Sequence, residues 1–196
     1  MGAPVFDRTI GLQWLIALSY HWFGRSELAV RLPSMAASLL AIGLTWRLGR
    51  RLHPASTGLW GAAILTVMPL WMQASKLGMQ DILLVCLELL AIWALLHSED
   101  HPERRLGCGL LAGVAISLGF LAKSFMIVLP VVALLPYLIW ARKSHRHLTN
   151  IGLYYGLGLG AIPTLVWLGR SYARYGPLPF KSTFWKTSAV VPGQFR

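Results

Sequence analysis

A small set of charged side chains lies at the borders of long apolar stretches of this sequence. Lys123 ends one such stretch and Asp81 precedes another. A cation there can stabilise a phosphate or another developing anion, and a carboxylate can accept a proton from a hydroxyl group or hold a divalent cation. Ionisable groups at the edge of an apolar phase are costly, so their recurrence predicts a polar site. The candidate site residues are Asp7, Arg8, Arg31, Asp81 and Lys123.

Each of these charges also has a purely structural interpretation. Lys123 can mark a helix end by extending its ammonium group to water, and Asp81 can cap the helix that follows, where free N–H groups favour a carboxylate. Arg31 can bind phosphate or anchor an interfacial helix. What favours a site is that separate segments bring both signs of charge to one face. Glu88 follows Asp81 by seven residues, about 10 Å deeper on nearly the same helix face, where it can line a polar cavity or pair with a polar group.

The elements that must position these charges are membrane-spanning helices. Of the 196 residues, 56% are hydrophobic and only 13% are charged, whereas a soluble domain normally carries about a quarter charged residues. The uncharged runs reach the roughly 17 to 25 residues that a helix needs to cross a bilayer, and in lipid only a helix satisfies its backbone within one segment. The sequence therefore predicts an all-α, polytopic transmembrane helical bundle, with about six spans and an outer interfacial helix. The spans are expected at 28–46, 57–74, 82–97, 106–122, 125–140 and 150–168.

Two flanking segments, 1–27 and 169–196, are predicted to lie outside the bundle of 28–168. Trp14 and Trp22 are typical of a membrane interface, so 9–24 is expected to lie in the outer interface. The chain would then enter the first span at a turn that places Pro33 near a helix start, where its missing N–H costs least. Kinks are expected at Pro69, Pro130, Pro136 and Pro163.

Glycines recur at four-residue spacing in two of the predicted spans. Gly109 and Gly113 form one pair, and Gly152, Gly156 and Gly160 form a series. This spacing indicates that another membrane helix approaches closely. It does not indicate a nucleotide-binding loop, because no strand precedes it.

Basic residues in the short loops predict the orientation. The loops 47–54, 99–105 and 141–147 hold eight Lys and Arg, whereas 75–81 and 122–124 hold one each. Basic loops stay in the cytoplasm. Asp81, Lys123 and both chain ends are therefore expected on the outer face, although Arg170, Arg174, Lys181 and Lys186 would then lie on that side as well.

The net charge of +11 does not indicate nucleic-acid binding, because the positive charges are divided among loops between spans. Most of the charge is a topology signal, and the rest favours contact with membrane lipids that carry phosphate. His145 and His147 fall in a basic loop where headgroup or water contact is expected. Cys86 and Cys108 lie in or at the ends of different spans without metal-ligand spacing, which favours packing roles.

The order and spacing of several motifs resemble those of a known family. The chain is similar to membrane glycosyltransferases of the aminoarabinose transferase and protein O-mannosyltransferase type, which share the fold called GT-C. The resemblance covers nearly the whole chain. It is carried by residues 7–15, 23–27, 31–34, 48–52, 80–81 and 120–124.

The resemblance implies sugar transfer from a polyprenyl-phosphate donor in the bacterial plasma membrane, with the site at the outer boundary. Arg8 and Lys123 would stabilise the departing phosphate, and Asp81 would orient the acceptor or hold a divalent metal. The family usually has Lys-Pro-Pro or Lys-Pro-Ile where this chain has Arg8-Thr9-Ile10, and Thr-Lys-Gly where it has Ala122-Lys123-Ser124. The cation of each motif is kept in this chain, but the neighbouring proline or glycine is not. The resemblance therefore implies electrostatic roles for these residues and no particular backbone conformation.

In the family, an earlier span and an acidic outer loop, which is usually given the role of base, precede the region matched here. We therefore expect the chain to be an N-terminally incomplete fragment that also stops early and is inactive alone. Two other functions stay open. In a transporter or flippase of a lipid-linked or anionic substrate, Glu88, Asp81 and Lys123 would form a pathway. The chain could also be a membrane scaffold without catalysis.

Overall fold

The computed structural model of this chain describes residues 10–52, 55–140 and 147–175. Regular structure in these ranges is entirely helical, as predicted. Short 3-10 turns occupy Pro102–Arg104, Ser124–Ile127 and His147–Thr149. The α-helices are α1 (Gly11–Phe23), α2 (Glu27–Leu52), α3 (Ala55–Val67), α4 (Pro69–Lys76), α5 (Gln80–Asp100), α6 (Arg105–Lys123), α7 (Val128–Trp140) and α9 (Ile151–Tyr175).

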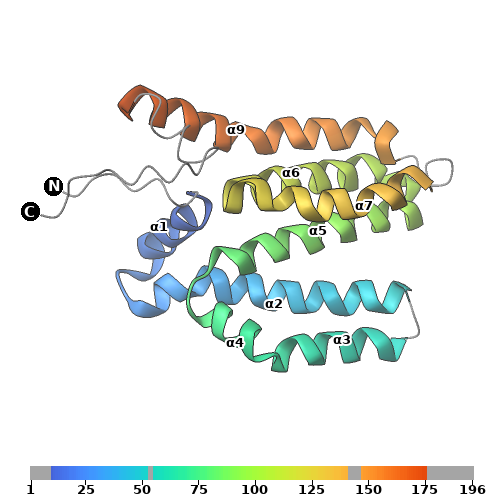
Figure 1. Cartoon of the computed structure of the whole chain (residues 1–196), viewed down its shortest axis with the longest axis horizontal. Helices are drawn as coiled ribbons and strands as arrows, with labels where there is room; N and C mark the ends of the chain where they lie inside the picture. The colour runs from blue at the N-terminus through green and yellow to red at the C-terminus, as the bar shows by residue number, and fades with distance from the viewer. Residues whose placement is uncertain (1–9, 53–54, 141–146, 176–196) are drawn as a thin grey trace, which may run out of the picture.

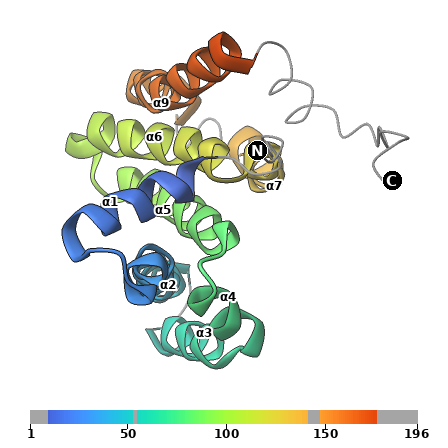
Figure 2. The same ribbon diagram turned by 90° about the vertical axis from the view of Figure 1, so that its left-hand side faces the viewer.

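Five helices pack side by side in the order α9, α6, α5, α2 and α3 (Figure 1). Helix α1 crosses one end of this stack, where it contacts α2, α5 and α6 (Figure 2). Its approach to α6 is close, since a Cβ added at Gly11 would lie 2.8 Å from the Leu121 carbonyl oxygen. The predicted interfacial segment is thus a helix laid across the end of the bundle.

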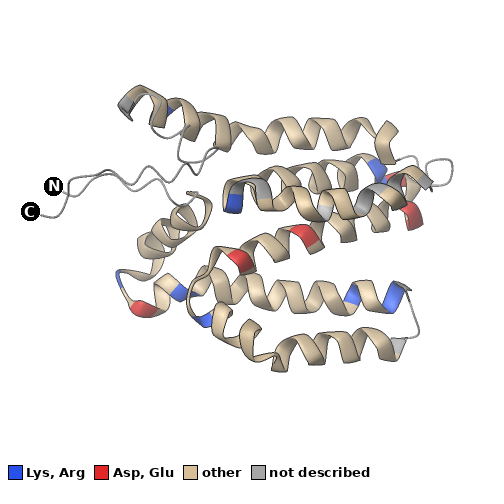
Figure 3. Cartoon of the chain, viewed as in Figure 1, with Lys and Arg blue, Asp and Glu red and all other residues tan. Residues whose placement is uncertain are grey.

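Four of the six predicted spans are helices long and apolar enough to cross a membrane within the described residues. They are Glu27–Arg51, Gln80–Asp100, Pro102–Lys123 and Ile151–Ala173. Charged residues lie mainly toward the two ends of these helices (Figure 3). This arrangement is the one expected of a bundle whose middle lies in lipid.

The other two predicted spans differ from expectation. The stretch 57–74 is divided between α3 and α4 at Met68, which has an extended backbone with φ −65° and ψ 119°. The cause is Pro69, because the residue before a proline disfavours the helical conformation. Helix α3 has 13 residues, about 20 Å, against the roughly 30 Å of a bilayer core. The stretch 125–140 begins as a 3-10 turn and continues as α7, also 13 residues long.

The first span was expected to begin at 28, and α2 begins at Glu27, but the expected placement of Pro33 near the helix start is wrong, because Pro33 lies inside α2. Local capping decides the start. Gly24 ends the preceding helix with a φ of 72°, and the Ser26 hydroxyl accepts the Ala29 N–H at 3.2 Å. The hydroxyl oxygen of buried Ser34 lies 2.9 Å from the carbonyl oxygens of both Arg31 and Ser75 and shares its one proton between them, which ties α2 to the end of α4.

The glycine series predicted to allow close helix approach is confirmed at the α6–α9 interface. Cβ atoms added at Gly113, Gly152 or Gly156 would collide with backbone atoms of the facing helix. Polar groups bond across the same interface. The Ser117 hydroxyl donates to the Leu157 carbonyl at 2.9 Å, and the buried Asn150 amide donates to the Arg105 carbonyl at 2.7 Å. Packing and hydrogen bonds of this kind hold membrane helices together.

A prediction follows for two glycines of α9. Alanine at either position should favour helix by about 1 kcal/mol. At Gly156 the added methyl meets the Leu110 backbone, whereas at Gly158 there is open space. Overpacking costs about 1–3 kcal/mol, so Gly156→Ala should lower the unfolding temperature in detergent, while Gly158→Ala leaves it equal or higher. Equal behaviour of the two variants would contradict this interface.

Candidate active site

The site begins where α5 starts and α6 ends. These helices run antiparallel through a short connection, so the first turn of α5 and the last turn of α6 share one end of the bundle. Gly78, with a φ of 66°, turns the chain into α5. The Lys123 ammonium group, on the last residue of α6, forms an ion pair with the Asp81 carboxylate. Two candidate residues separated by 42 positions are thus brought into contact.

The Asp81 side chain does not cap α5, which corrects the capping interpretation. The N-cap position is Met79, and no side chain there caps the helix. Asp81 lies within the first turn, where its charge still favours the exposed N–H groups, and its oxygen binds Lys123 instead. Both side chains are partly open to solvent, with 52% of Asp81 and 36% of Lys123 exposed. A pair this exposed contributes at most about 1 kcal/mol to the stability of the fold, so it can be opened at small cost.

The remaining candidate residues are not part of this pair. Arg31 forms an ion pair with Glu27, one turn earlier on α2, which fits the anchoring interpretation at least as well as phosphate binding. Asp7 and Arg8 lie outside the described residues. Glu88 is half-buried in α5, two turns below Asp81.

A possible divalent metal at Asp81 lacks a ready-made ligand set in the described ranges. No group of three or more His, Cys, Asp or Glu residues gathers there to hold an ion. A single carboxylate does not make a magnesium or calcium site without further oxygen ligands. Metal binding at Asp81 therefore stays a prediction.

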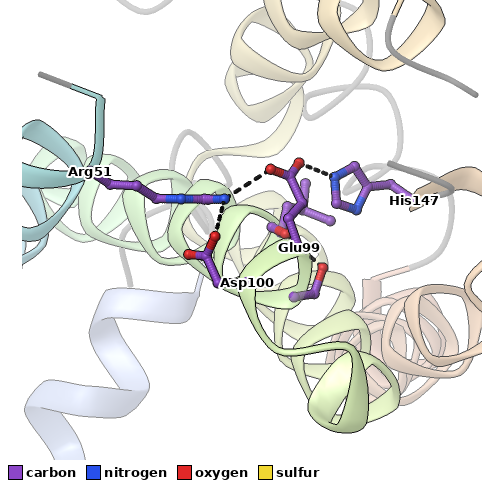
Figure 4. Close-up of polar contacts among 6 residues, drawn as sticks. Arg51, Glu99, Asp100 and His147 are labelled. Atoms are coloured by element: carbon purple, nitrogen blue, oxygen red, sulfur yellow. Dashed lines mark hydrogen bonds and ion pairs between the residues drawn. The ribbon is translucent and has the colours of Figure 1, made fainter. Parts of the chain in front are cut away.

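Sequence reasoning missed a second charged cluster at the opposite end of the bundle (Figure 4). Glu99, near the end of α5, contacts Arg51 of α2 at 2.9 Å and His147 at 2.7 Å. Arg51 also contacts Asp100 at 3.0 Å. His147 was expected to contact headgroups or water, but only 3% of its side chain is exposed. The available signal was that the loop 99–105 holds three acids, Glu99, Asp100 and Glu103, whereas the loops 47–54 and 141–147 hold none.

The chain matches known proteins in sequence and in fold. The sequence profile of the family described as dolichyl-phosphate-mannose-protein mannosyltransferase matches residues 7–169. A relative from Pseudomonas paraeruginosa, named undecaprenyl phosphate-alpha-4-amino-4-deoxy-L-arabinose arabinosyl transferase, is 35% identical over 171 residues, which are 85% of this chain and 29% of that protein. A protein of the same name, numbered 1, from Pseudomonas fluorescens is 32% identical over 73% of this chain and 26% of its own length. The chain thus spans less than a third of the length of these relatives.

Two crystal structures of ArnT from Cupriavidus metallidurans share the fold. The apo structure aligns with a TM-score of 0.77 at 21% identity, covering 93% of this chain and 34% of that one. The structure bound to undecaprenyl phosphate aligns with a TM-score of 0.76 at 22% identity, covering 91% and 34%. Together with the helical bundle and the site at its end, the match over 7–169 means that this chain belongs to the family of dolichyl-phosphate-mannose-protein mannosyltransferases.

Proposed function

We propose that this chain is part of an integral membrane glycosyltransferase of the bacterial plasma membrane, which transfers a sugar from a polyprenyl-phosphate donor to a hydroxyl group of a lipid, glycan or protein. The observation that carries the proposal is the Asp81–Lys123 pair at one end of the bundle. The relatives named as undecaprenyl-phosphate sugar transferases support the donor class. The sugar and the acceptor are not specified by these residues.

The pair can serve this transfer with a cation for the leaving group and a carboxylate that positions the acceptor. When the acceptor oxygen bonds to the sugar carbon, the bond from that carbon to the phosphate oxygen breaks and the polyprenyl phosphate leaves as an anion. Lys123 would offset the charge that develops on the leaving phosphate, with Arg8 assisting as a second cation. The hydroxyl proton passes to a carboxylate. Asp81 would orient the acceptor, or hold a metal, while a separate carboxylate takes the proton as the general base.

The partial exposure of the pair suits this role. Because the Asp81–Lys123 contact is open to solvent, a phosphate can compete for Lys123 at small cost. The pair sits at the end of apolar helices, where we expect a lipid phosphate to reach it while the lipid chain stays in the bilayer. A transporter would instead place its charges near the midplane. Of the acidic and basic residues in the described spans, only Glu88 lies well inside a helix. One half-buried carboxyl group does not make a transport pathway.

The outer location of this site depends on the orientation predicted from the loops. A reporter that is active only in the cytoplasm should work when fused at position 102 and fail when fused at position 78, since the Glu99 cluster and the Asp81 site lie at opposite ends of α5. The reverse pattern would place the site on the cytoplasmic face and overturn the outer-face proposal.

Substitution of the pair tests the chemistry in the intact protein. Lys123→Ala should lower turnover on the order of a hundredfold or more, because an electrostatic contact to the leaving group is lost, and Lys123→Arg should recover part of it. Lys76→Ala removes an exposed cation from the same end of the bundle and serves as the matched control. Consumption of a polyprenyl-phosphate sugar is the measurement, because a transporter would leave the donor intact.

Asp81→Asn tests the second residue of the pair. It keeps the size of the side chain and removes the charge, so a large loss of turnover is expected if Asp81 orients the acceptor or a metal. Thermal unfolding in detergent identifies variants that are merely unstable. Near-normal turnover of both Lys123→Ala and Asp81→Asn, with unfolding temperatures unchanged, would refute the site.

A further inference from the structure

An open cavity of about 510 Å³ lies at the end of the bundle opposite to the Asp81–Lys123 pair. Its walls are the last turns of α2 and α5, and its lining includes Arg47, Arg50 and Arg51. Asp100, which also lines it, lies 19 residues beyond Asp81 on α5, which corresponds to about 28 Å. The cavity is therefore separate from the proposed catalytic site.

The three arginines of the cavity differ in how their charge is used. Arg51 contacts two acids, Glu99 at 2.9 Å and Asp100 at 3.0 Å, so its charge is compensated. Arg47 and Arg50 have no acidic partner within the described part of the chain. The cavity thus keeps an excess of positive charge at its mouth, where both side chains are exposed.

Two tryptophans hold these arginines without consuming their hydrogen-bond donors. The Arg47 guanidinium lies 5.8 Å from the Trp93 ring centroid, and that of Arg50 lies 4.9 Å from the Trp46 ring. A cation–π contact engages no oxygen acceptor, so it leaves guanidinium N–H groups available to an anion. Such a planar fork matches the oxygens of a phosphate.

An exposed apolar surface leads from the membrane to this cavity. On α2, Leu39 and Leu40 are 72% and 63% exposed, and Gly43 and Trp46 continue the exposed face up to Arg47. From Leu40 to Arg50 the rise is about 15 Å. A ligand with a phosphate at the arginines and hydrocarbon along α2 would contact the whole surface, whereas a free phosphate would use only its upper end.

We propose that this cavity binds the phosphate headgroup of an anionic phospholipid, whose acyl chains lie along the Leu39–Trp46 face of α2. Arg47 and Arg50 donate to the phosphate oxygens, and the bound lipid bridges the ends of α2 and α5. Basic pockets between membrane helices are suited to such headgroups. The site is distinct from donor binding and does not depend on the proposed transferase reaction.

The test compares lipid binding by single variants of the delipidated protein in detergent. Arg47→Gln and Arg50→Gln remove charge inside the cavity. Arg104→Gln removes an exposed charge at the same end, in the turn before α6 and outside the cavity. Native mass spectrometry measures the apparent Kd for phosphatidylglycerol, for phosphatidylcholine as the zwitterionic comparison, and for inorganic phosphate. Thermal unfolding without added lipid confirms that each variant is folded.

Phosphatidylglycerol should bind the unsubstituted protein more tightly than phosphatidylcholine. Arg47→Gln and Arg50→Gln should each weaken phosphatidylglycerol binding about tenfold, as expected for a lost charge-assisted contact. Arg104→Gln should leave the affinity for phosphatidylglycerol within about twofold of that of the unsubstituted protein. Three results would overturn the proposal: inorganic phosphate binding as tightly as phosphatidylglycerol, equal weakening by Arg104→Gln, or unchanged affinity in both folded cavity variants.

Discussion

The close approach of α6 and α9 along their glycines is the constraint on which the rest of the bundle depends. In lipid there is no hydrophobic force that drives one apolar helix toward another, so packing and hydrogen bonds must do so. Gly113 and Gly156 let the two backbones meet, and Ser117 and Asn150 add bonds across the interface. Because α6 also packs on α5, this interface fixes one partner of the pair that brings Lys123 to Asp81.

Helix α5 carries a charged contact at each end, and the two contacts differ in what they can do. At its start the Asp81–Lys123 pair is open to solvent, so it is weak and available to a ligand. Near its end Glu99 bridges Arg51 and the buried His147, which join α2 and the segment before α9 to α5. The second contact is more enclosed, with 15% of the Glu99 side chain and 3% of the His147 side chain exposed, so its charges are costlier to leave unpaired. One end is therefore suited to chemistry and the other to holding the helices together.

Much of this arrangement was predictable because the bilayer limits the choices. Long uncharged runs can only be helices there, and the glycine spacing of α6 and α9 reported a close contact that the structure confirms. The contact between Asp81 and Lys123 followed in outline, since two antiparallel spans joined at 101–104 must bring their other two ends, which carry these residues, to one face. Four of the six expected spans are long apolar helices in the described residues.

The predictions that failed concerned features set by competing local signals or by residues far away in the sequence. Pro33 was expected near a helix start, but the capping hydroxyl of Ser26 and the left-handed backbone of Gly24 set the start of α2 at Glu27, which leaves Pro33 inside the helix. A kink was expected at Pro69, but the proline divides the predicted span 57–74 into two helices. The burial of His147 depends on Glu99, 48 residues away, and periodicity carries no information about such a pairing.

The central claim is that Lys123 receives the phosphate of a polyprenyl lipid in competition with Asp81. Equilibrium binding of undecaprenyl phosphate, which carries no sugar, tests this claim apart from turnover, in the intact protein reconstituted in nanodiscs. We predict that Lys123→Gln weakens binding about tenfold or more, consistent with a lost charge-assisted contact, whereas Lys76→Gln changes it little. Asp81→Asn should leave affinity equal or stronger, because the competing carboxylate is gone. Undiminished affinity in Lys123→Gln, or a loss in Asp81→Asn as large as that expected for Lys123→Gln, would contradict the account.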